Sequence, residues 1–331
     1  MYNSIGNTLR LTTFGESHGT AIGGILDGCT ANIPIDEQLL RSDIQRRQVG
    51  DTLYGVSFEQ FATPRHEPDN VTFLSGILDG TTLGTPIAFV INNSDTNGAD
   101  YNVLQSLYRP LHADRTWEQR FGRRDPRGGG RASARETVAR VVAGVVAKSI
   151  LKTHDINVIA TVKSLAGIEI SNNATALQAS QILADIQQKG DTAGGTITCT
   201  VEGMPAGIGN PTFDRLQSRL AYALMSIPTV RAFEFGQGSS APNLTGSEYI
   251  AYSQEHTDGI IGGISDGNPV TIRLALHPVG TIAQGTPCLD RDGNTHVVKP
   301  QGRHDTCHVP RTAVIVEAMT ALTIADLMIT Q

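Results

Sequence analysis

The sequence has few residues of several kinds, and each shortage argues against a class of protein. Its four cysteines (Cys29, Cys199, Cys288 and Cys307) are far apart and form no C-x-x-C pair, so neither a zinc ribbon nor a disulfide-stapled scaffold is expected. No run of about 18 apolar residues is apparent, so no membrane span is expected. The first residues carry no cationic start followed by a long apolar stretch, which predicts a cytoplasmic protein without a secretory signal.

Lysine and net positive charge are scarce as well. Only 5 of the 26 basic residues are lysine, and the net charge is −6, so a basic surface for nucleic acid is not expected. The 21 arginines are unevenly spread, because nine of them lie between Arg109 and Arg140. The planar guanidinium group suits phosphate and carboxylate, which it binds through two hydrogen bonds. This cluster therefore predicts an anion site.

The remaining composition is that of a globular protein. Apolar residues make up 39% of the chain and charged residues 18%, which allows a sizeable core. No linker rich in proline, serine or glycine divides the sequence, so we predict one domain over residues 1–331. Periodicity and turn signals predict alternating strands and helices. Strands are expected at 8–14, 21–26, 71–78, 85–91, 156–163, 195–201 and 270–276, and helices after Asp36 and at 133–152, 175–189, 212–225 and 311–329.

Local signals predict several boundaries. Asp36 is expected to cap a helix, and Ser133 with Glu136 forms the S-x-x-E pattern of a capping box. Asp79-Gly80 is expected to join the strands at 71–78 and 85–91. The segment at 311–329 is apolar on most sides, which predicts a buried helix.

A faint internal echo accompanies these elements. Residues 21–28 read AIGGILDG and residues 260–267 read IIGGISDG, each preceded by a histidine. The echo allows an internal duplication with two copies facing one site, but short glycine-rich strands also arise by chance.

The first motif with chemical content is Gly15-Glu16-Ser17-His18-Gly19. Its G-x-S-x-G spacing matches the nucleophile elbow of serine hydrolases, with Ser17 as the nucleophile. Only one strand can precede it, whereas the elbow normally follows several strands, so that function is the less favoured one. A histidine between glycines on a loop is better suited to approach a ligand and exchange a proton. A turn whose polar residues only cap one another also stays open.

Two further motifs lie in the arginine-rich region. His112 follows Arg109 on a short loop fixed by Pro110, so it can serve as an acid or base beside an anionic ligand. The three glycines at 128–130 lead into a helix with arginines on both sides. Backbone N–H groups at such a start bind phosphate, and glycine lets the ligand come close. A solvated histidine and a mobile glycine loop remain the alternatives.

The last motif is Gly302-Arg303-His304-Asp305-Thr306-Cys307. Its arginine, histidine and aspartate either supply an acid–base group to a site or form a surface turn. Two histidines flank Cys307 but no second cluster of metal ligands accompanies them, so no metal is predicted.

Taken together and in this order, the four motifs resemble the chorismate synthase family, and the resemblance extends from Ile5 to about Leu327. It implies an α+β fold in which helices pack between antiparallel β-sheets with internal pseudo-symmetry, and a homotetramer. It also implies a lyase of the shikimate pathway that makes chorismate by 1,4-elimination of phosphate from 5-enolpyruvylshikimate 3-phosphate. Reduced FMN (FMNH2) is the implied cofactor, and the sequence leaves open whether NADPH reduces it.

The resemblance also implies roles for single residues. His18 would protonate the departing phosphate, His112 the reduced flavin, and Asp305 would assist proton removal. The residues implied to bind substrate are Ser17, Arg46, Arg47, Arg109 and Arg135. The residues implied to bind the cofactor are Arg131, Ala132, Ser133, Pro228, Thr229, Gly262, His277 and Arg303.

The sequence departs from the family pattern at several of these positions. Gln48-Val49 replaces Arg-Pro, Pro228-Thr229 replaces Asn-Ala, His277 replaces lysine, and Thr306 replaces proline. The loop at 51–63 is longer than usual. These departures leave open a paralogue that binds flavin or another anion without turnover.

Overall fold

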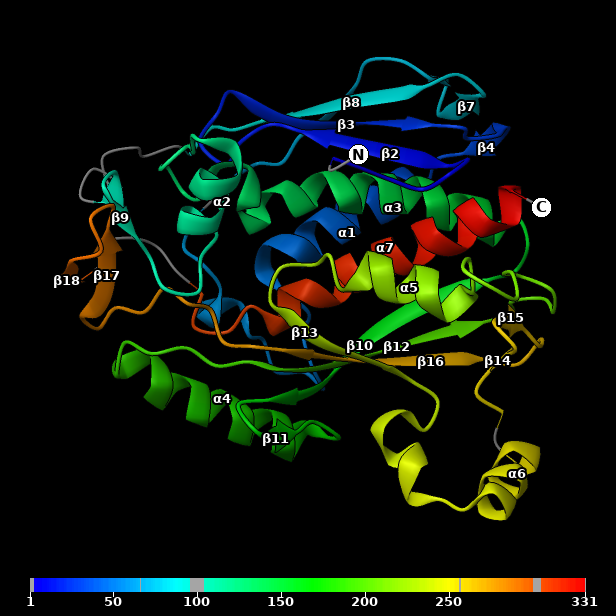
Figure 1. Ribbon diagram of the computed structural model, residues 1–331. Helices are drawn as coiled ribbons and strands as arrows, with labels where there is room; N and C mark the ends of the chain where they lie inside the picture. The colour runs from blue at the N-terminus through cyan, green and yellow to red at the C-terminus, as the bar shows by residue number, and fades with distance from the viewer. Residues whose placement is uncertain (1–2, 66, 96–103, 256, 300–304, 331) are drawn as a thin grey trace.

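The computed structural model describes residues 3–65, 67–95, 104–255, 257–299 and 305–330. Some of its helices form a central layer, and the others lie around the periphery (Figure 1). The helices are α1 (Glu37–Val49), α2 (Asp114–Phe121), α3 (Thr137–Lys152), α4 (Asn173–Gln188), α5 (Leu216–Leu224), α6 (Gly246–Glu255) and α7 (Val309–Ile329).

Two five-stranded antiparallel sheets enclose the central helices. The first sheet has the order β1 (Ser4–Ile5), β2 (Arg10–Phe14), β3 (Ala21–Asp27), β8 (Ile87–Asn92), β5 (Val71–Phe73). The second has the order β11 (Ile168–Glu169), β10 (Asn157–Leu165), β12 (Gly195–Glu202), β16 (Val270–Leu276), β13 (Val230–Phe235). Alternate residues of β10, β12 and β16 are buried, as expected for strands with one face on a core.

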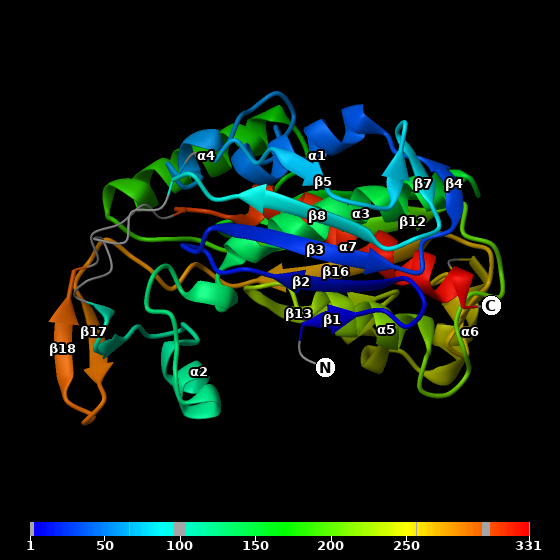
Figure 2. The same ribbon diagram turned by 90° about the horizontal axis from the view of Figure 1, so that it is seen from above.

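Smaller sheets complete the described part of the chain. One contains β4 (Ala31–Pro34), β7 (Thr81–Leu83) and β6 (Ile77–Leu78), and another is the hairpin of β14 (Ile260–Ile261) and β15 (Ile264–Ser265). The third contains β18 (Thr295–Val298), β17 (Thr286–Asp290) and β9 (Leu107–Tyr108). Figure 2 shows this third sheet and α2 together at one end of the molecule.

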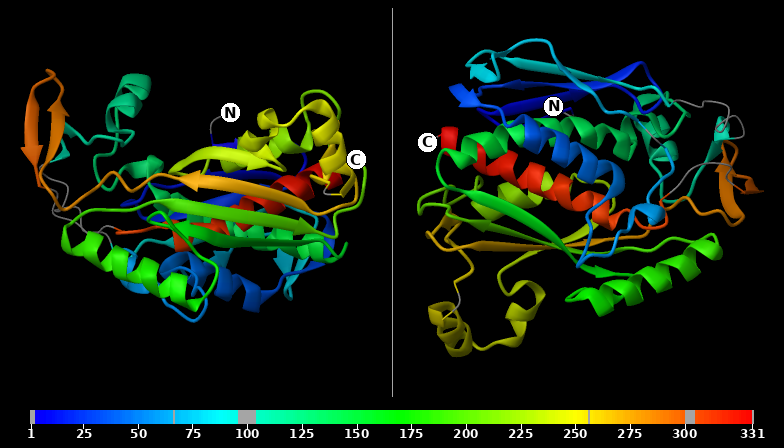
Figure 3. Two further views of the ribbon diagram at one scale, coloured as in Figure 1. Left: turned by 90° about the horizontal axis from the view of Figure 1, so that it is seen from below. Right: turned by 180° about the vertical axis from the view of Figure 1, so that it is seen from behind.

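The core is the interface of α3 and α7 between the two sheets. α3 contacts β2 and β3 of the first sheet, and α7 contacts β10 and β12 of the second. The helices approach closely because Gly144 of α3 has no side chain: a Cβ there would lie 2.6 Å from the Cα of Ala318. Figure 3 shows the strands of the second sheet in front of these helices, with the first sheet behind.

The C-terminal helix α7 is long and apolar enough to cross a membrane by length and composition alone. It contains Arg311, Glu317 and Asp326, so it is not the uninterrupted apolar run that the sequence was expected to lack. In the structure 89% of its most apolar window is buried, so here it is a core helix, as the apolar pattern predicted.

Several predicted elements are confirmed, and some boundaries are corrected. Asp36 caps α1 by accepting a hydrogen bond from the backbone N–H of Leu39. The capping box at Ser133 was wrong: α3 begins at Thr137, and the carboxylate of Glu136 pairs with Arg131 and Arg140 instead of turning back to the cap. Residues 134–136 form a separate 3-10 turn.

The strand pairing around residue 80 also differs from the prediction. The turn at Asp79-Gly80 joins the short strands β6 and β7, while β5 pairs directly with β8. The two echo segments take different structures. Residues 21–27 form the long strand β3, whereas residues 260–265 form a hairpin of two strands with two residues each. Their similarity in sequence is therefore no evidence for a duplication. α5 starts at Leu216, later than expected, and α2, α6, β13, β17 and β18 were not predicted.

Candidate active site

Two adjoining cavities lie near the start of α3. The smaller one, of about 250 Å³, is called the arginine cavity because Arg47, Arg65, Arg135 and Arg311 line it. The larger one, of about 850 Å³, is called the loop cavity because the loop at 123–131 forms much of its wall. The residues that line both cavities are Gly128, Ser133, Ala134, Pro228, Thr229 and Val279.

The arginine cavity is built from side chains of the central helices. Arg47 comes from the last turn of α1, Arg135 from the 3-10 turn before α3, and Arg311 from the first turn of α7. The side chains of Arg47 and Arg135 are nearly fully buried. Both reach the buried carboxylate of Asp69, Arg135 at 2.5 Å and Arg47 at 3.4 Å.

The charges around this cavity do not balance. Among the described residues of the lining, four guanidinium groups face three carboxylates, Glu67, Asp69 and Asp305, which leaves an excess of one positive charge. Burial, followed by the charges of Arg311 and Arg135, lowers the pKa of Arg47 to about 9 in spite of Asp69. An anion bound here would reduce that cost.

A second sign of a missing anion is a donor without an acceptor. Within the part of the chain that the structure describes, Nη2 of Arg135 is buried and has no hydrogen-bond partner. A buried donor left unsatisfied costs about 1–3 kcal/mol, more when charged, so such atoms are rare unless a ligand or water supplies the acceptor.

Asp305 lies at the same cavity and is held in its ionised form. Its Oδ1 accepts hydrogen bonds from Arg311, at 2.6 Å, and from the backbone N–H of Thr63, at 3.0 Å. Burial alone would raise the pKa of this carboxyl group, but Arg311, His308 and Thr63 outweigh it and the pKa lies below its usual value. The carboxylate can therefore accept a proton at neutral pH.

His308 and Thr229 form a polar contact in the wall between the cavities. Their side chains are joined by a 2.6 Å hydrogen bond at Nε2 of His308. Burial lowers the pKa of this imidazole to about 4, so it is neutral near pH 7. Thr229 has a positive φ of 73°, which is strained for a β-branched residue and typical of positions shaped by function.

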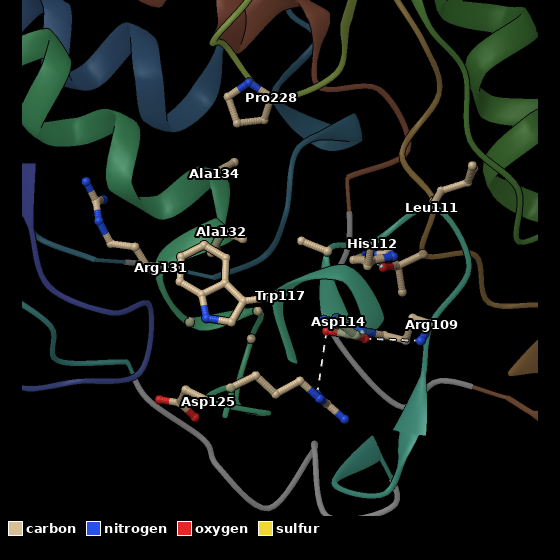
Figure 4. Close-up of a pocket in the computed structure, with 18 of the residues that line it drawn as sticks. Arg109, Leu111, His112, Asp114, Trp117, Asp125, Arg131, Ala132, Ala134 and Pro228 are labelled. Atoms are coloured by element: carbon tan, nitrogen blue, oxygen red, sulfur yellow. Dashed lines mark hydrogen bonds and ion pairs between the residues drawn. The ribbon is translucent and has the colours of Figure 1, made fainter. Parts of the chain in front are cut away.

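Among the described residues, the loop cavity is lined by the glycine run at 128–130, by small side chains and by six arginines (Arg109, Arg123, Arg124, Arg127, Arg131 and Arg231). Gly128, Gly129 and Gly130 all have positive φ, so this stretch can curve around a ligand at no steric cost. Figure 4 shows Trp117, Ala132, Ala134 and Pro228 around the cavity. The exposed arginines at its edge are Arg123, Arg127 and Arg231.

His112 faces the loop cavity in a defined tautomer. Its Nδ1 donates to the carbonyl of Pro110 at 2.8 Å, so the neutral ring accepts at Nε2 from the hydroxyl of Thr281 at 2.9 Å. Burial, and then the charge of Arg109, lowers the pKa of His112 below its usual value. The ring is therefore neutral near pH 7, and once protonated it would release the proton readily.

The structure brings most of the predicted site residues to these cavities. Ser17, Arg47, Arg135 and Asp305 line the arginine cavity. Arg109, His112, Arg131, Ala132 and His277 line the loop cavity, and Ser133, Pro228 and Thr229 line both. The second cofactor arginine, Arg303, lies outside the described residues.

Two predicted ligands lie elsewhere within this chain. Arg46 points into another cleft, where it pairs with Asp51 and Glu317. Neighbouring residues of a helix point in directions about 100° apart, so Arg46 and Arg47 cannot share one cavity. Gly262 lies in the turn between β14 and β15 and lines neither of the two cavities.

The two predicted site arginines that line the loop cavity have their guanidinium groups already bound to protein. Arg109 forms two hydrogen bonds with Asp114, at 2.8 and 2.9 Å, and so braces the loop that carries His112. The side chain of Arg131 contacts Thr13 and Glu136 and points away from the cavity in Figure 4. Both therefore shape the cavity more than they offer it charge.

The geometry of the first motif disfavours a serine nucleophile. Oγ of Ser17 accepts a hydrogen bond from Arg65 at 3.0 Å, and a guanidinium group cannot act as the base that such a nucleophile requires. The imidazole of His18 packs against Gly128, where any Cβ would collide with the ring. His18 thus lies directly behind a residue that lines both cavities.

The motifs did not indicate several residues of these cavities, among them Arg65, Asp69, Arg311 and Trp117, although Arg65 could have been considered as a cation that compensates for Gln48. Arg311 was detectable, because a single arginine in the first turn of a strongly apolar helix needs a buried partner or a ligand. Arg65 and Asp69 lie in a loop without regular pattern, and their convergence depends on the tertiary fold.

Comparisons with known proteins give a consistent result. Residues 9–329 match the family model described as chorismate synthase. A chorismate synthase of Parabacteroides distasonis is 39% identical, over 99% of this chain and 98% of the relative, and one of Azobacteroides pseudotrichonymphae is 42% identical over 98% of each. A solved structure titled as chorismate synthase covers 98% of this chain and 93% of its own, at 26% identity and a TM-score of 0.74. The predicted α+β fold is thereby confirmed.

Proposed function

The chain belongs to the chorismate synthase family of carbon–oxygen lyases, and from that premise we propose that it eliminates phosphate from 5-enolpyruvylshikimate 3-phosphate to give chorismate. The main support is the uncompensated positive charge of the arginine cavity, next to the ionised Asp305. This substrate carries one phosphate and two carboxylates, so it can supply an acceptor for the unsatisfied Nη2 of Arg135 and offset the excess positive charge of the described lining.

The loop cavity fits reduced FMN by shape and by the chemistry of its wall. A volume of about 850 Å³ is in the range of cofactor sites, and the glycines at 128–130 have positive φ, so the backbone of the wall bends there without steric cost. Ala132, Ala134, Pro228 and Trp117 would contact the flat ring, and the exposed arginines at the edge would meet the phosphate. Reduced FMN supplies the electron density that lets phosphate leave a ring whose lost hydrogen is not acidic.

The roles proposed for the chain's own residues follow from their states. The elimination breaks one C–O bond, whose electron pair leaves with phosphate, and one C–H bond, whose electrons form the new double bond. The arginines of the arginine cavity would bind the anionic groups, and His18 would donate a proton to the departing phosphate. Asp305 would accept a proton, since it is present as the carboxylate. His112 would exchange a proton with the ligand of the loop cavity through Nε2.

The proposal is tested by anaerobic incubation of the protein with substrate and reduced FMN, while phosphate and chorismate are followed together. Oxidised FMN in a parallel reaction is the control and should give neither product. Equal amounts of both products would support the lyase. Binding of substrate and FMN without either product would instead identify a paralogue without turnover. The homotetramer and the cytoplasmic location remain predictions, and light scattering of the purified protein measures the former.

A further inference from the structure

We propose that residues 53–63 form a positioning segment that fixes the carboxylate of Asp305. The N–H of Thr63 binds the carboxylate, and the carbonyl of Phe61 holds the segment to the chain by accepting a hydrogen bond from the backbone N–H of Thr306. This inference rests on the proposed function, in which Asp305 accepts a proton. The sequence suggested only that the loop is long and that residue 306 is not proline. The structure shows that these two features meet in one hydrogen-bonded unit.

The positioning segment is anchored at its base. Phe58 and Phe61 are 2% and 1% exposed, and their ring centroids lie 6.1 Å apart in the core. Two side chains of α4 bind its backbone from outside: Asn173 donates to the carbonyl of Tyr54 at 2.9 Å, and Gln187 to that of Gln60 at 3.0 Å. A segment held on both sides in this way can transmit its position to its neighbours.

The far end of the segment binds Asp305 and the backbone that follows it. The carbonyl of Phe61 accepts hydrogen bonds from the N–H of Thr306, at 2.8 Å, and of Cys307, at 3.2 Å. Two residues on, the N–H of Thr63 donates to Oδ1 of Asp305 at 3.0 Å. The segment therefore binds the backbone that follows Asp305 and the Asp305 carboxylate itself.

This arrangement determines which carboxylate oxygen can react. Thr63 and Arg311 both donate to Oδ1 of Asp305. Among the described residues no donor is bound to Oδ2, and Asp305 lines the arginine cavity. Oδ2 is therefore the atom that accepts the proton, and the positioning segment sets its direction by holding Oδ1.

Thr306→Pro is the sharpest test, because proline has no N–H and cannot donate to Phe61. Thr306→Ala keeps the N–H and is the matched control. We expect Thr306→Pro to lower kcat by about 10- to 100-fold, the range for a reacting group displaced by about 1 Å. KM for the substrate should change by less than about threefold, since the arginines stay in place, and Thr306→Ala should stay within about twofold of the wild type.

Hydrogen exchange of the ligand-free protein gives a readout that does not depend on turnover. The N–H of Thr63 should exchange faster in Thr306→Pro than in Thr306→Ala. If Thr306→Pro does not fold, the double variant Asn173→Ala/Gln187→Ala decides, because it loosens the same segment from the exposed side of α4 and should lower kcat several-fold with KM unchanged.

The outcomes separate this inference from the proposed function. Wild-type activity together with unchanged kcat and unchanged exchange in the folded variants would overturn the inference and leave the function intact. An equal loss in Thr306→Pro and Thr306→Ala, or a loss in KM alone, would overturn it as well. A wild type without turnover would contradict the proposed function. Faster exchange at Thr63 in Thr306→Pro would still support the connection between the positioning segment and Asp305.

Discussion

The two cavities share a wall but are built in opposite ways. The arginine cavity consists of buried charged side chains on α1, the turn before α3, and α7, the most rigidly packed part of the fold. The loop cavity consists of glycine backbone, small side chains, the peripheral helix α2 and, among the described residues, six arginines, three of them exposed. Both cavities therefore offer positive charge, but the first presents it from buried side chains and the second partly from exposed ones.

The contrast has a physical reason. A buried guanidinium group is costly unless it is held against its partners, so it belongs on a helix that the core fixes. A flat ring needs close backbone approach, which positive-φ glycines allow and helices do not. Because Ser133, Pro228 and Thr229 belong to both walls, ligands of the two cavities would lie next to each other.

The largest effect should come from the acid proposed to act on the departing phosphate. We expect His18→Ala to lower kcat by about 10²–10⁴-fold, the range for a positioned general acid, while substrate affinity changes little. Single-turnover assays and substrate titration measure the two quantities separately. Near-normal turnover in this variant would show that His18, behind Gly128, does not serve the reaction.

The division of labour between the cavities is tested by a matched pair of variants. Arg135→Gln removes the unsatisfied donor of the arginine cavity and should weaken substrate binding by about 10- to 100-fold, since charge-assisted hydrogen bonds are worth about 1.5–3 kcal/mol. Trp117→Ala should weaken FMN binding instead. Calorimetric titration of both ligands into both variants checks this. If each variant lost both ligands equally, the cavities would not be separate sites.

His308, in the wall between the cavities, should make the free energy of unfolding depend on pH. The pKa of His308 is about 4 in the folded protein and 6.5 in the unfolded chain. Between these two pH values the unfolded chain therefore binds a proton at His308 and the folded protein does not. Stability should therefore fall as the pH falls, by about 2 kcal/mol between pH 7 and pH 5 from this group. Urea unfolding of the wild type and of His308→Gln at both pH values measures it. An equal pH dependence in the two proteins would contradict the buried neutral imidazole.

Sequence and tertiary structure contributed differently to these two cavities. The glycine run at 128–130 and the loop of His112 were recognisable as motifs because their chemistry is local. The arginine cavity was only partly predictable: Arg47 and Arg135 were found, but their convergence on Asp69 requires α1 and the start of α3 to lie side by side. Arg46 was misplaced for the same reason, since the direction of a helical side chain depends on which face is packed.

The smallest effect concerns His277, which lines the loop cavity and is only partly buried. Its Nδ1 donates to the carbonyl of Pro278 at 2.6 Å, so this nitrogen is already occupied by the protein. His277→Lys adds an ammonium group near the exposed arginines. Because solvent screens such a charge to about 0.2–1 kcal/mol, we expect FMN to bind up to about fivefold more tightly, as measured by fluorescence titration. Gln48→Arg, on the other side of the wall, is the matched control and should tighten substrate instead. Equal or weaker FMN binding in His277→Lys would mean that residue 277 does not face the cofactor.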